Sequence, residues 1–145
     1  MVRCAPMARK TRQRPRNAPL VLVVEDDADT RRLFTEFLAA DGFRVSTAAD
    51  GLAAVVTATH ERPDVIVMDL SLPQVDGWNA SRQLKRNDAT ARIPIIACTG
   101  HTLGGSVERA LDAGCDAYIT KPCPPDVLAR EIRKVLRLTR PDGTT

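Results

Sequence analysis

The sequence predicts an α/β fold in which one doubly wound, parallel sheet of five strands carries helices on both faces. Three observations lead to this prediction. Short apolar runs are typical of buried strands, segments with helical periodicity alternate with them, and glycine or proline stands at several segment ends. Because crossovers between parallel strands are right-handed, only a few doubly wound topologies remain.

The predicted elements follow one another in a regular alternation from residue 20 onward. The strands are predicted at residues 20–24, 43–47, 64–68, 93–98 and 116–120. The helices are predicted at residues 27–40, 51–61, 78–86, 106–113 and 124–138. A chain of 145 residues with this alternation and no internal repeat is expected to form one domain.

Local patterns justify the first elements. Residues 20–24 form a short apolar, β-branched run, and the third strand contains a second such run at 65–68. Gly42 stops the first helix, and Pro63 closes the second. The apolar residues that indicate these two helices are Leu33, Phe34, Phe37 and Leu38 in the first, and Leu52, Val55 and Val56 on one face of the second.

The later elements follow in the same way. Leu84 is expected to face inward from the third helix, and Pro94 is tolerable near the start of the fourth strand. Gly114 is expected to end the fourth helix in a left-handed cap. Two prolines suit the first turn of the last helix. Its inner face is predicted from Leu128, Ile132, Val135 and Leu136.

The net charge of +3 is unevenly distributed. Residues 1–19 hold six basic residues and no acid, and we expect them to form a disordered basic arm. The rest of the chain then holds 15 basic and 18 acidic residues, so the alkaline arm does not mark the whole protein as a binder of nucleic acid. Residues 140–145 are expected to be a short tail.

The cysteines do not suggest a metal site. Cys4, Cys98, Cys115 and Cys123 form no C-x-x-C pair, and the chain has only two histidines, so a zinc site is not expected. Cys98 ends an apolar run and is predicted to be a small core residue. No apolar run is long enough to span a membrane and no signal peptide is evident, so we expect reduced thiols in the cytoplasm.

Chemically active side chains follow four of the five predicted strands. In an open parallel sheet, ligands bind at the carboxyl ends of the strands. The residues that follow the apolar runs are Glu25, Asp26 and Asp27, then Asp69, Thr99 and Lys121. Neither a Ser/His/Asp arrangement nor a glycine-rich phosphate loop competes with them.

This set of groups suits phosphoryl transfer. Carboxylates that lie close together repel one another, and Mg²⁺, which prefers oxygen ligands, relieves that repulsion. A carboxylate can also attack phosphorus and form an aspartyl phosphate. Asp69 ends the middle strand of the series and is the best candidate nucleophile, while the Lys121 ammonium and the Thr99 hydroxyl would neutralise or bind phosphoryl oxygens.

Five motifs in order resemble the receiver domain of two-component response regulators. They are VVEDD at 23–27, VMDLSLP at 67–73, DG at 76–77, ACTG at 97–100 and YITKP at 118–122. The resemblance covers about residues 19–139, with a receiver domain expected at 20–139. It implies a flavodoxin-like sheet with the strand order 2-1-3-4-5 and a cis bond between Lys121 and Pro122.

The resemblance also implies a role for each matching residue. Asp26 would bind Mg²⁺ directly and Glu25 often through water, while the backbone carbonyl of Ser71 would complete the metal site. Asp69 would be the phosphoacceptor and a further metal ligand. Thr99 and Lys121 would contact the phosphoryl group. Thr99 and Tyr118 would form the switch, Tyr118 through an inward or outward rotamer.

The sequence thus suggests a single-domain response regulator. A histidine kinase or a histidine phosphotransfer protein would donate the phosphoryl group to Asp69, and the output would be protein–protein contact, without DNA binding or a membrane span. One alternative is a binding module that does not use phosphate. Another is an aspartate-nucleophile phosphatase of the haloacid-dehalogenase type, which would need a second aspartate where Ser71 stands.

Several residues have a plainer interpretation. Asp27 and Asp29 are expected to cap the first helix rather than to bind metal. Trp78 is expected to lie partly in the core near the site. The basic stripe, which comprises Arg130, Arg133, Lys134 and Arg137, is either an exposed helix face or a partner surface.

Overall fold

The fold of the chain is that of a parallel sheet between two layers of helices. A computed structural model describes residues 18–70, 77–99 and 111–139. Its five strands are all parallel and lie in the order β2-β1-β3-β4-β5. Both the predicted fold class and the implied strand order are therefore confirmed.

The elements lie close to their predicted places. The strands are β1 (Leu20–Val24), β2 (Arg44–Ala48), β3 (Val65–Asp69), β4 (Ile95–Thr99) and β5 (Ala117–Thr120). The helices are α2 (Ala28–Ala40), α3 (Gly51–Glu61), α4 (Gly77–Arg86) and α6 (Pro125–Thr139). The helix predicted at 106–113 lies mostly outside the described residues, although Leu111 and Asp112 are helical.

The second strand begins one residue later than predicted. The amide of Phe43 donates a hydrogen bond to the carbonyl of Leu38 at 3.1 Å, so Phe43 still belongs to the turn that ends α2. Gly42 lies in that turn with φ +104°, and Gly114 has φ +95°, the left-handed conformation predicted for it. These two glycines stand where a side chain would strain the backbone.

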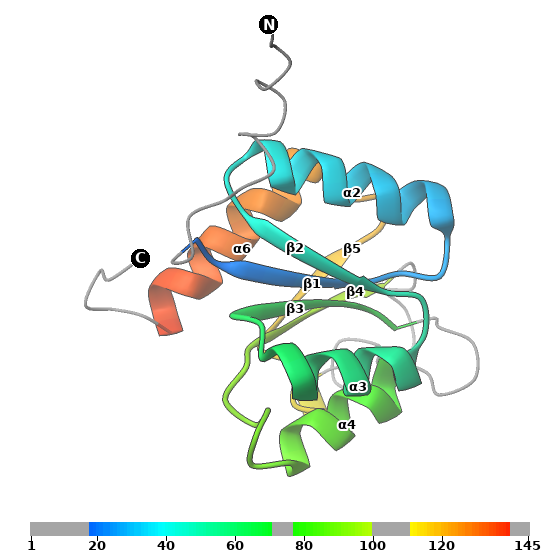
Figure 1. Ribbon diagram of the computed structural model, residues 1–145, viewed down its shortest axis with the longest axis vertical. Coiled ribbons are helices and arrows are strands. Elements are labelled where there is room, and N and C mark those ends of the chain that lie inside the picture. Colours follow the sequence, from blue (N-terminus) through cyan, green and yellow to red (C-terminus); the bar gives the residue numbers. More distant parts are fainter. Residues whose placement is uncertain (1–17, 71–76, 100–110, 140–145) are drawn as a thin grey trace, which may run out of the picture.

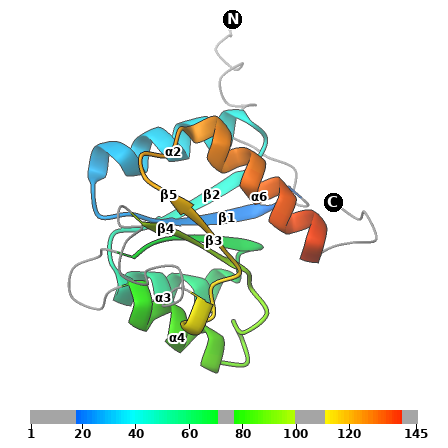
Figure 2. The same cartoon turned by 180° about the vertical axis from the view of Figure 1, so that it is seen from behind.

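Each face of the sheet has its own core. Figures 1 and 2 show α2 and α6 on one side of the sheet and α3 and α4 on the other. Successive residues of β1 alternate between the two cores, since Val21 and Val23 pack with α2 and α6 whereas Leu22 and Val24 pack on the opposite side. As predicted, Cys98 is buried in the core. The predicted inner faces of the third and last helices are also buried, namely Leu84, Leu128, Ile132, Val135 and Leu136.

The predicted inner face of α3 is confirmed only for Val55, which packs partly buried against the core. Leu52 and Val56 are 57% and 49% exposed, while Ala54 and Ala58 are fully buried. The reason is that α3 contacts α4 as well as the sheet, and small side chains allow the closest approach to both. In α2 the predicted set divides, because Phe34 and Leu38 are buried while Leu33 and Phe37 stay exposed.

An aspartate fixes the start of α3. The Oδ1 atom of Asp50 accepts a hydrogen bond from the amide of Ala53 at 2.8 Å. We expect Asp50→Ala to lower the free energy of unfolding by about 1 kcal/mol, because the amide loses its cap. Urea denaturation would measure the change, with the exposed Asp88→Ala as the control, expected within roughly 0.5 kcal/mol of wild type. Equal losses in both variants would contradict the capping role.

No helix in residues 18–70, 77–99 and 111–139 has both the length and the apolar character needed to cross a membrane.

Candidate functional site

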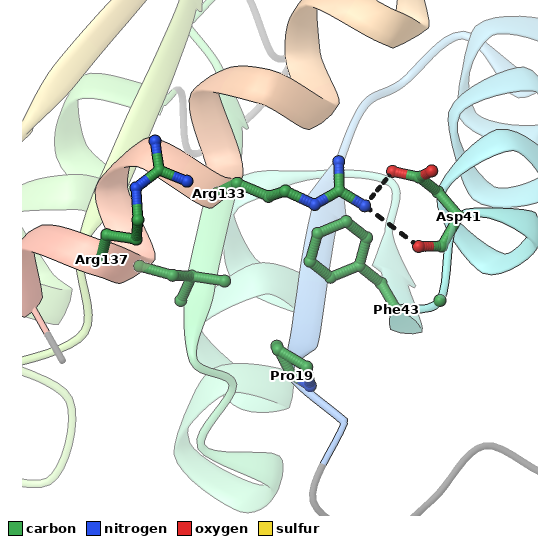
Figure 3. A pocket seen from close by; sticks show the side chains of 7 residues that line it. Pro19, Asp41, Phe43, Arg133 and Arg137 are labelled. Carbon is green, nitrogen blue, oxygen red and sulfur yellow. Dashed lines mark hydrogen bonds and ion pairs between the residues drawn. The ribbon is translucent and has the colours of Figure 1, made fainter. Parts of the chain in front are cut away.

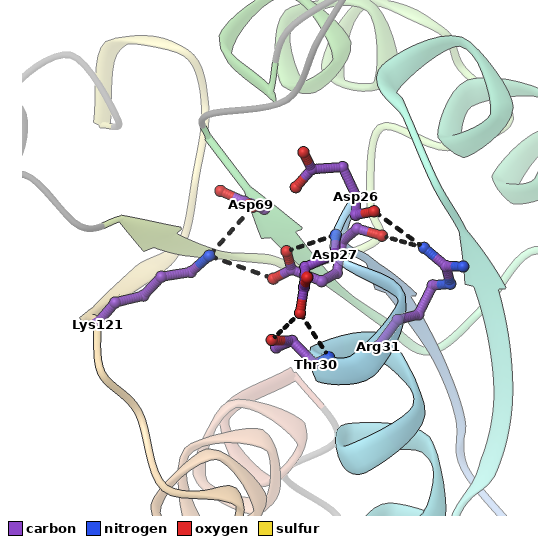
Figure 4. Close-up of polar contacts among 7 residues, drawn as sticks. Asp26, Asp27, Thr30, Arg31, Asp69 and Lys121 are labelled. Carbon is purple, nitrogen blue, oxygen red and sulfur yellow. Dashed lines mark hydrogen bonds and ion pairs between the residues drawn. The ribbon is translucent and has the colours of Figure 1, made fainter.

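Three carboxylates meet at the carboxyl edge of the sheet. Glu25 and Asp26 directly follow β1, and Asp69 is the last residue of β3. Because β1 and β3 are neighbours, with Val24 paired to Met68, the two strand ends lie side by side. A carboxylate oxygen from each residue lies within 4.8 Å of the others. We call Glu25, Asp26 and Asp69 the acid cluster (Figure 4).

An ammonium group reaches the acid cluster from the edge strand. Lys121 directly follows β5, and its Nζ atom lies 3.2 Å from Glu25 Oε1 and 3.1 Å from Asp69 Oδ2. The two carboxylate side chains are only 5% and 3% exposed, so the ion pairs are largely shielded from water. The Lys121–Pro122 peptide bond is cis, as the resemblance implied.

The charges in this group influence one another. Burial and the nearby charge of Asp69 raise the pKa of Glu25, although the Asp27 amide and Lys121 oppose that change. Burial lowers the pKa of Lys121, but the two carboxylates raise it more, so the net change is upward. Lys121 therefore keeps its positive charge between two acids.

The raised pKa of Glu25 predicts a pH effect on the metal-free protein. The folded state favours the protonated form of Glu25, and this preference contributes to the stability of the fold. The contribution is complete below the ordinary pKa of 4.5 and is lost as the pH rises through the raised pKa. Without metal, wild type should therefore lose stability relative to Glu25→Gln as the pH rises from 4.5 through the raised pKa of Glu25.

Urea denaturation in EDTA across that pH range would test this prediction. Glu36→Gln, which replaces an exposed glutamate on α2, is the control, and its difference from wild type should not follow the same pH dependence. A constant difference between wild type and Glu25→Gln would contradict the prediction.

Asp27 starts a helix rather than joining the acid cluster. Its Oδ2 atom accepts hydrogen bonds from the amide of Thr30 at 2.8 Å and from the hydroxyl of Thr30 at 2.6 Å. These bonds lower the pKa of Asp27. Asp27 is thus the N-cap of α2, as predicted. Asp29, in the first turn, forms an exposed ion pair with Arg32 at 3.8 Å.

Two residues that contact the site were given no role from the sequence, although Gly77 belongs to the DG motif at 76–77. Arg31 Nη1 donates hydrogen bonds to the carbonyl of Glu25 at 2.8 Å and to that of Asp26 at 3.5 Å. The sequence did contain a signal for Arg31. A cation in the first turn of a helix opposes the helix dipole, so its presence there indicates a compensating contact. Gly77 packs against the backbone of Asp69 and Leu70 so closely that no side chain fits between. No local pattern in the sequence indicates that contact.

The remaining predicted site residues are only partly described. The backbone of Thr99 lies in β4 opposite Thr120, but its side chain is outside the described part of the structure. Ser71 also lies outside the described residues. Tyr118 is 42% exposed on β5, which is an edge strand. Trp78 packs in part against the core, as predicted.

A cavity of about 370 Å³ lies at the amino ends of the strands, opposite the acid cluster (Figure 3). Its lining residues are Pro19, Asp41, Gly42, Phe43, Arg133, Leu136 and Arg137. Arg133 forms an ion pair with Asp41 and lies 5.1 Å from the centre of the Phe43 ring. This member of the basic stripe therefore links the end of α2 to α6, and the cavity contains no residue of the acid cluster.

Comparisons with known proteins agree with this arrangement. The family model of the response regulator receiver domain matches residues 21–133. A curated relative, the polar-differentiation response regulator DivK of Brucella anthropi, is 39% identical over 102 residues, which cover 70% of this chain and 83% of the relative.

Solved structures show the same architecture. A CheY-like receiver domain protein from Methanospirillum hungatei JF-1 has a TM-score of 0.81 with 24% identity, covering 88% of this chain and all of the other, and shows the shared fold. The receiver domain of sensor histidine kinase PA1611 from Pseudomonas aeruginosa PAO1 has a TM-score of 0.72 with 35% identity, covering 83% of this chain and 95% of that domain. That structure has a magnesium ion coordinated in its active site cleft.

Proposed function

Because the chain belongs to the response regulator receiver family, we propose that it accepts a phosphoryl group on Asp69 in the presence of Mg²⁺. The observation that best supports this is the surroundings of the Asp69 carboxylate. It is almost fully buried at the end of β3, lies 3.1 Å from an ammonium group, and shares an edge of the sheet with two more carboxylates. A buried acid with this much nearby charge suits chemistry rather than fold stability alone.

The acid cluster fits a magnesium ion by its chemistry. All its donors are carboxylate oxygens, the ligands that Mg²⁺ prefers, and Asp26 is exposed, so water ligands could remain. Glu25, Asp26 and Asp69 would hold the ion, together with the backbone carbonyl of Ser71 that the family implies. Bound Mg²⁺ would offset the repulsion among the carboxylates and the charge of an incoming phosphoryl group.

The chain's own residues would act on a phosphohistidine donor as follows. A carboxylate oxygen of Asp69 attacks phosphorus and forms a new O–P bond. The P–N bond of the donor breaks, its electron pair returns to the imidazole nitrogen, and that ring takes up one proton. Lys121, already beside Asp69, would then contact the new phosphoryl oxygens, and Thr99 is the proposed second contact.

The signal would leave the protein through contact with another protein. A histidine kinase or a histidine phosphotransfer protein is the proposed donor. Tyr118 is the proposed switch residue together with Thr99, since its half-exposed side chain on an edge strand has room to change rotamer when the phosphoryl group is present. The downstream target is a protein that distinguishes the two states of this edge.

Intact-protein mass spectrometry tests the proposal. After incubation with Mg²⁺ and acetyl phosphate, wild type should carry one phosphoryl group, and EDTA should prevent the labelling. The proposal fails if neither acetyl phosphate nor a phosphorylated phosphotransfer protein labels the chain and millimolar Mg²⁺ leaves the fluorescence of Trp78 unchanged. That result would favour the binding module, whereas sustained hydrolysis of a generic phosphoester would favour the phosphatase.

A further inference from the structure

We propose that Arg31 is a positioning residue, whose guanidinium holds the backbone that presents Glu25 and Asp26 and thereby sets the Mg²⁺ affinity of the acid cluster. This inference rests on the proposed function, because it assumes that the acid cluster binds the ion. It concerns a residue that touches none of the proposed ligand oxygens among its described contacts.

The contacts of Arg31 define its place. Its Nη1 atom donates at 2.8 Å to the carbonyl of Glu25 and, more weakly, at 3.5 Å to that of Asp26. The amide of Glu25 donates in turn to the carbonyl of Ala48 in β2 at 3.0 Å. The peptide groups on both sides of the Glu25 side chain are therefore tied to other elements, which limits how far its carboxylate can move.

Arg31 and Lys121 act from different sides. Figure 4 shows Lys121 approaching the carboxylates from one side and Arg31 reaching the backbone from the other. Lys121 pairs directly with the carboxylates of Glu25 and Asp69. A bound metal ion would therefore contact the same carboxylates as Lys121 does. Arg31 instead donates to carbonyl oxygens and, among its described hydrogen bonds, to no carboxylate oxygen.

An arginine is suited to this position and a simple basic residue is less so. The rigid planar guanidinium fixes the direction of its donors, so that Nη1 can face two successive carbonyls. Its charge stands in the first turn of α2, where the helix dipole disfavours a cation, so the contact with the backbone must offset that cost. Residues that orient metal ligands in this way typically change metal affinity by about 10- to 100-fold when replaced.

Mg²⁺ titrations of three full-length variants test the inference. Trp78, the only tryptophan in the chain, provides the fluorescence signal. Arg31→Met is expected to raise the dissociation constant for Mg²⁺ about tenfold, and Arg31→Lys to give a smaller rise because its ammonium group can still donate to a carbonyl. Arg32→Met is the matched control, since Arg32 is the next residue of the same helix and pairs only with the exposed Asp29 among the described contacts.

A second readout needs no metal. In EDTA, the Glu25 amide of Arg31→Met should exchange its hydrogen faster than in wild type, while urea denaturation gives equal unfolding free energies for Arg31→Met and Arg32→Met within about 0.5 kcal/mol. If wild type binds Mg²⁺ and both methionine variants bind it equally well, the role of Arg31 is wrong and the proposed function stands. If wild type itself does not bind Mg²⁺, the proposed function and this inference fail together.

Discussion

Replacing Asp69 with asparagine should reduce the rate of phosphoryl labelling by roughly a thousandfold or more. The amide has almost the same shape as the carboxylate, but its oxygen carries no full negative charge and is a poor nucleophile. The fold should persist, because the substitution also removes one of the mutually repelling charges beside Glu25. Intact mass after incubation with Mg²⁺ and acetyl phosphate measures the loss.

Asp27→Asn is the matched control for this experiment. Asp27 follows the acid cluster directly in sequence and caps α2, and asparagine caps helices about as well as aspartate does. Its labelling should stay within about twofold of wild type, because Asp27 takes no part in the acid cluster. Labelling of Asp69→Asn at the wild-type rate would show that another residue accepts the phosphoryl group.

An alanine at position 77 should be the most damaging small substitution near the site. A Cβ atom there would lie 2.7 Å from the Cα of Leu70 and closer still to the carbonyl oxygen of Asp69. Both are backbone atoms, which cannot rotate away as a side chain can. We expect Gly77→Ala to lower the free energy of unfolding by about 3 kcal/mol and to weaken Mg²⁺ binding, because the backbone that presents Asp69 must move.

Gly42→Ala separates the effect of this collision from that of losing a glycine. Gly42 has φ +104° and nothing within 4 Å of a Cβ atom, so alanine there costs only backbone strain, about 1 kcal/mol. Mg²⁺ affinity should not change in that variant. Urea denaturation and Mg²⁺ titration would compare the unfolding free energies and Mg²⁺ affinities of the two variants. Equal losses in both variants would show that the contact of Gly77 with Asp69 is unimportant.

The sequence was sufficient to predict the sheet and the acid cluster, because both depend on local pattern and one rule of topology. Apolar runs and the alternation with helices indicated the strands. The family resemblance implied that the first and third strands are neighbours, so the acids at their ends had to meet. Asp27 was also predictable, since a helix N-terminus favours a short acidic residue whatever lies around it.

Features that depend on tertiary contact were beyond such reasoning. Hydrophobicity places Leu52 inside, but the packing of α3 against both the sheet and its neighbour α4 selects Ala54 instead. The contact of Arg31 with the Glu25 carbonyl depends on the angle at which α2 leaves β1. The need for glycine at 77 arises from a neighbouring backbone segment. Composition and periodicity contain no information on these three tertiary contacts.

The reach of Lys121 has a consequence for how the edge of the molecule opens. Lys121 lies 96 residues after Glu25 in the chain, yet it joins the outermost strand to groups on β1 and β3, past the intervening β4. If β5 detached by local unfolding, the buried carboxylates of Glu25 and Asp69 would lose the counter-charge of Lys121. That electrostatic cost makes fraying of the edge strand less favourable. Through the charges of the site, β5 is thus expected to open together with the central strands rather than separately.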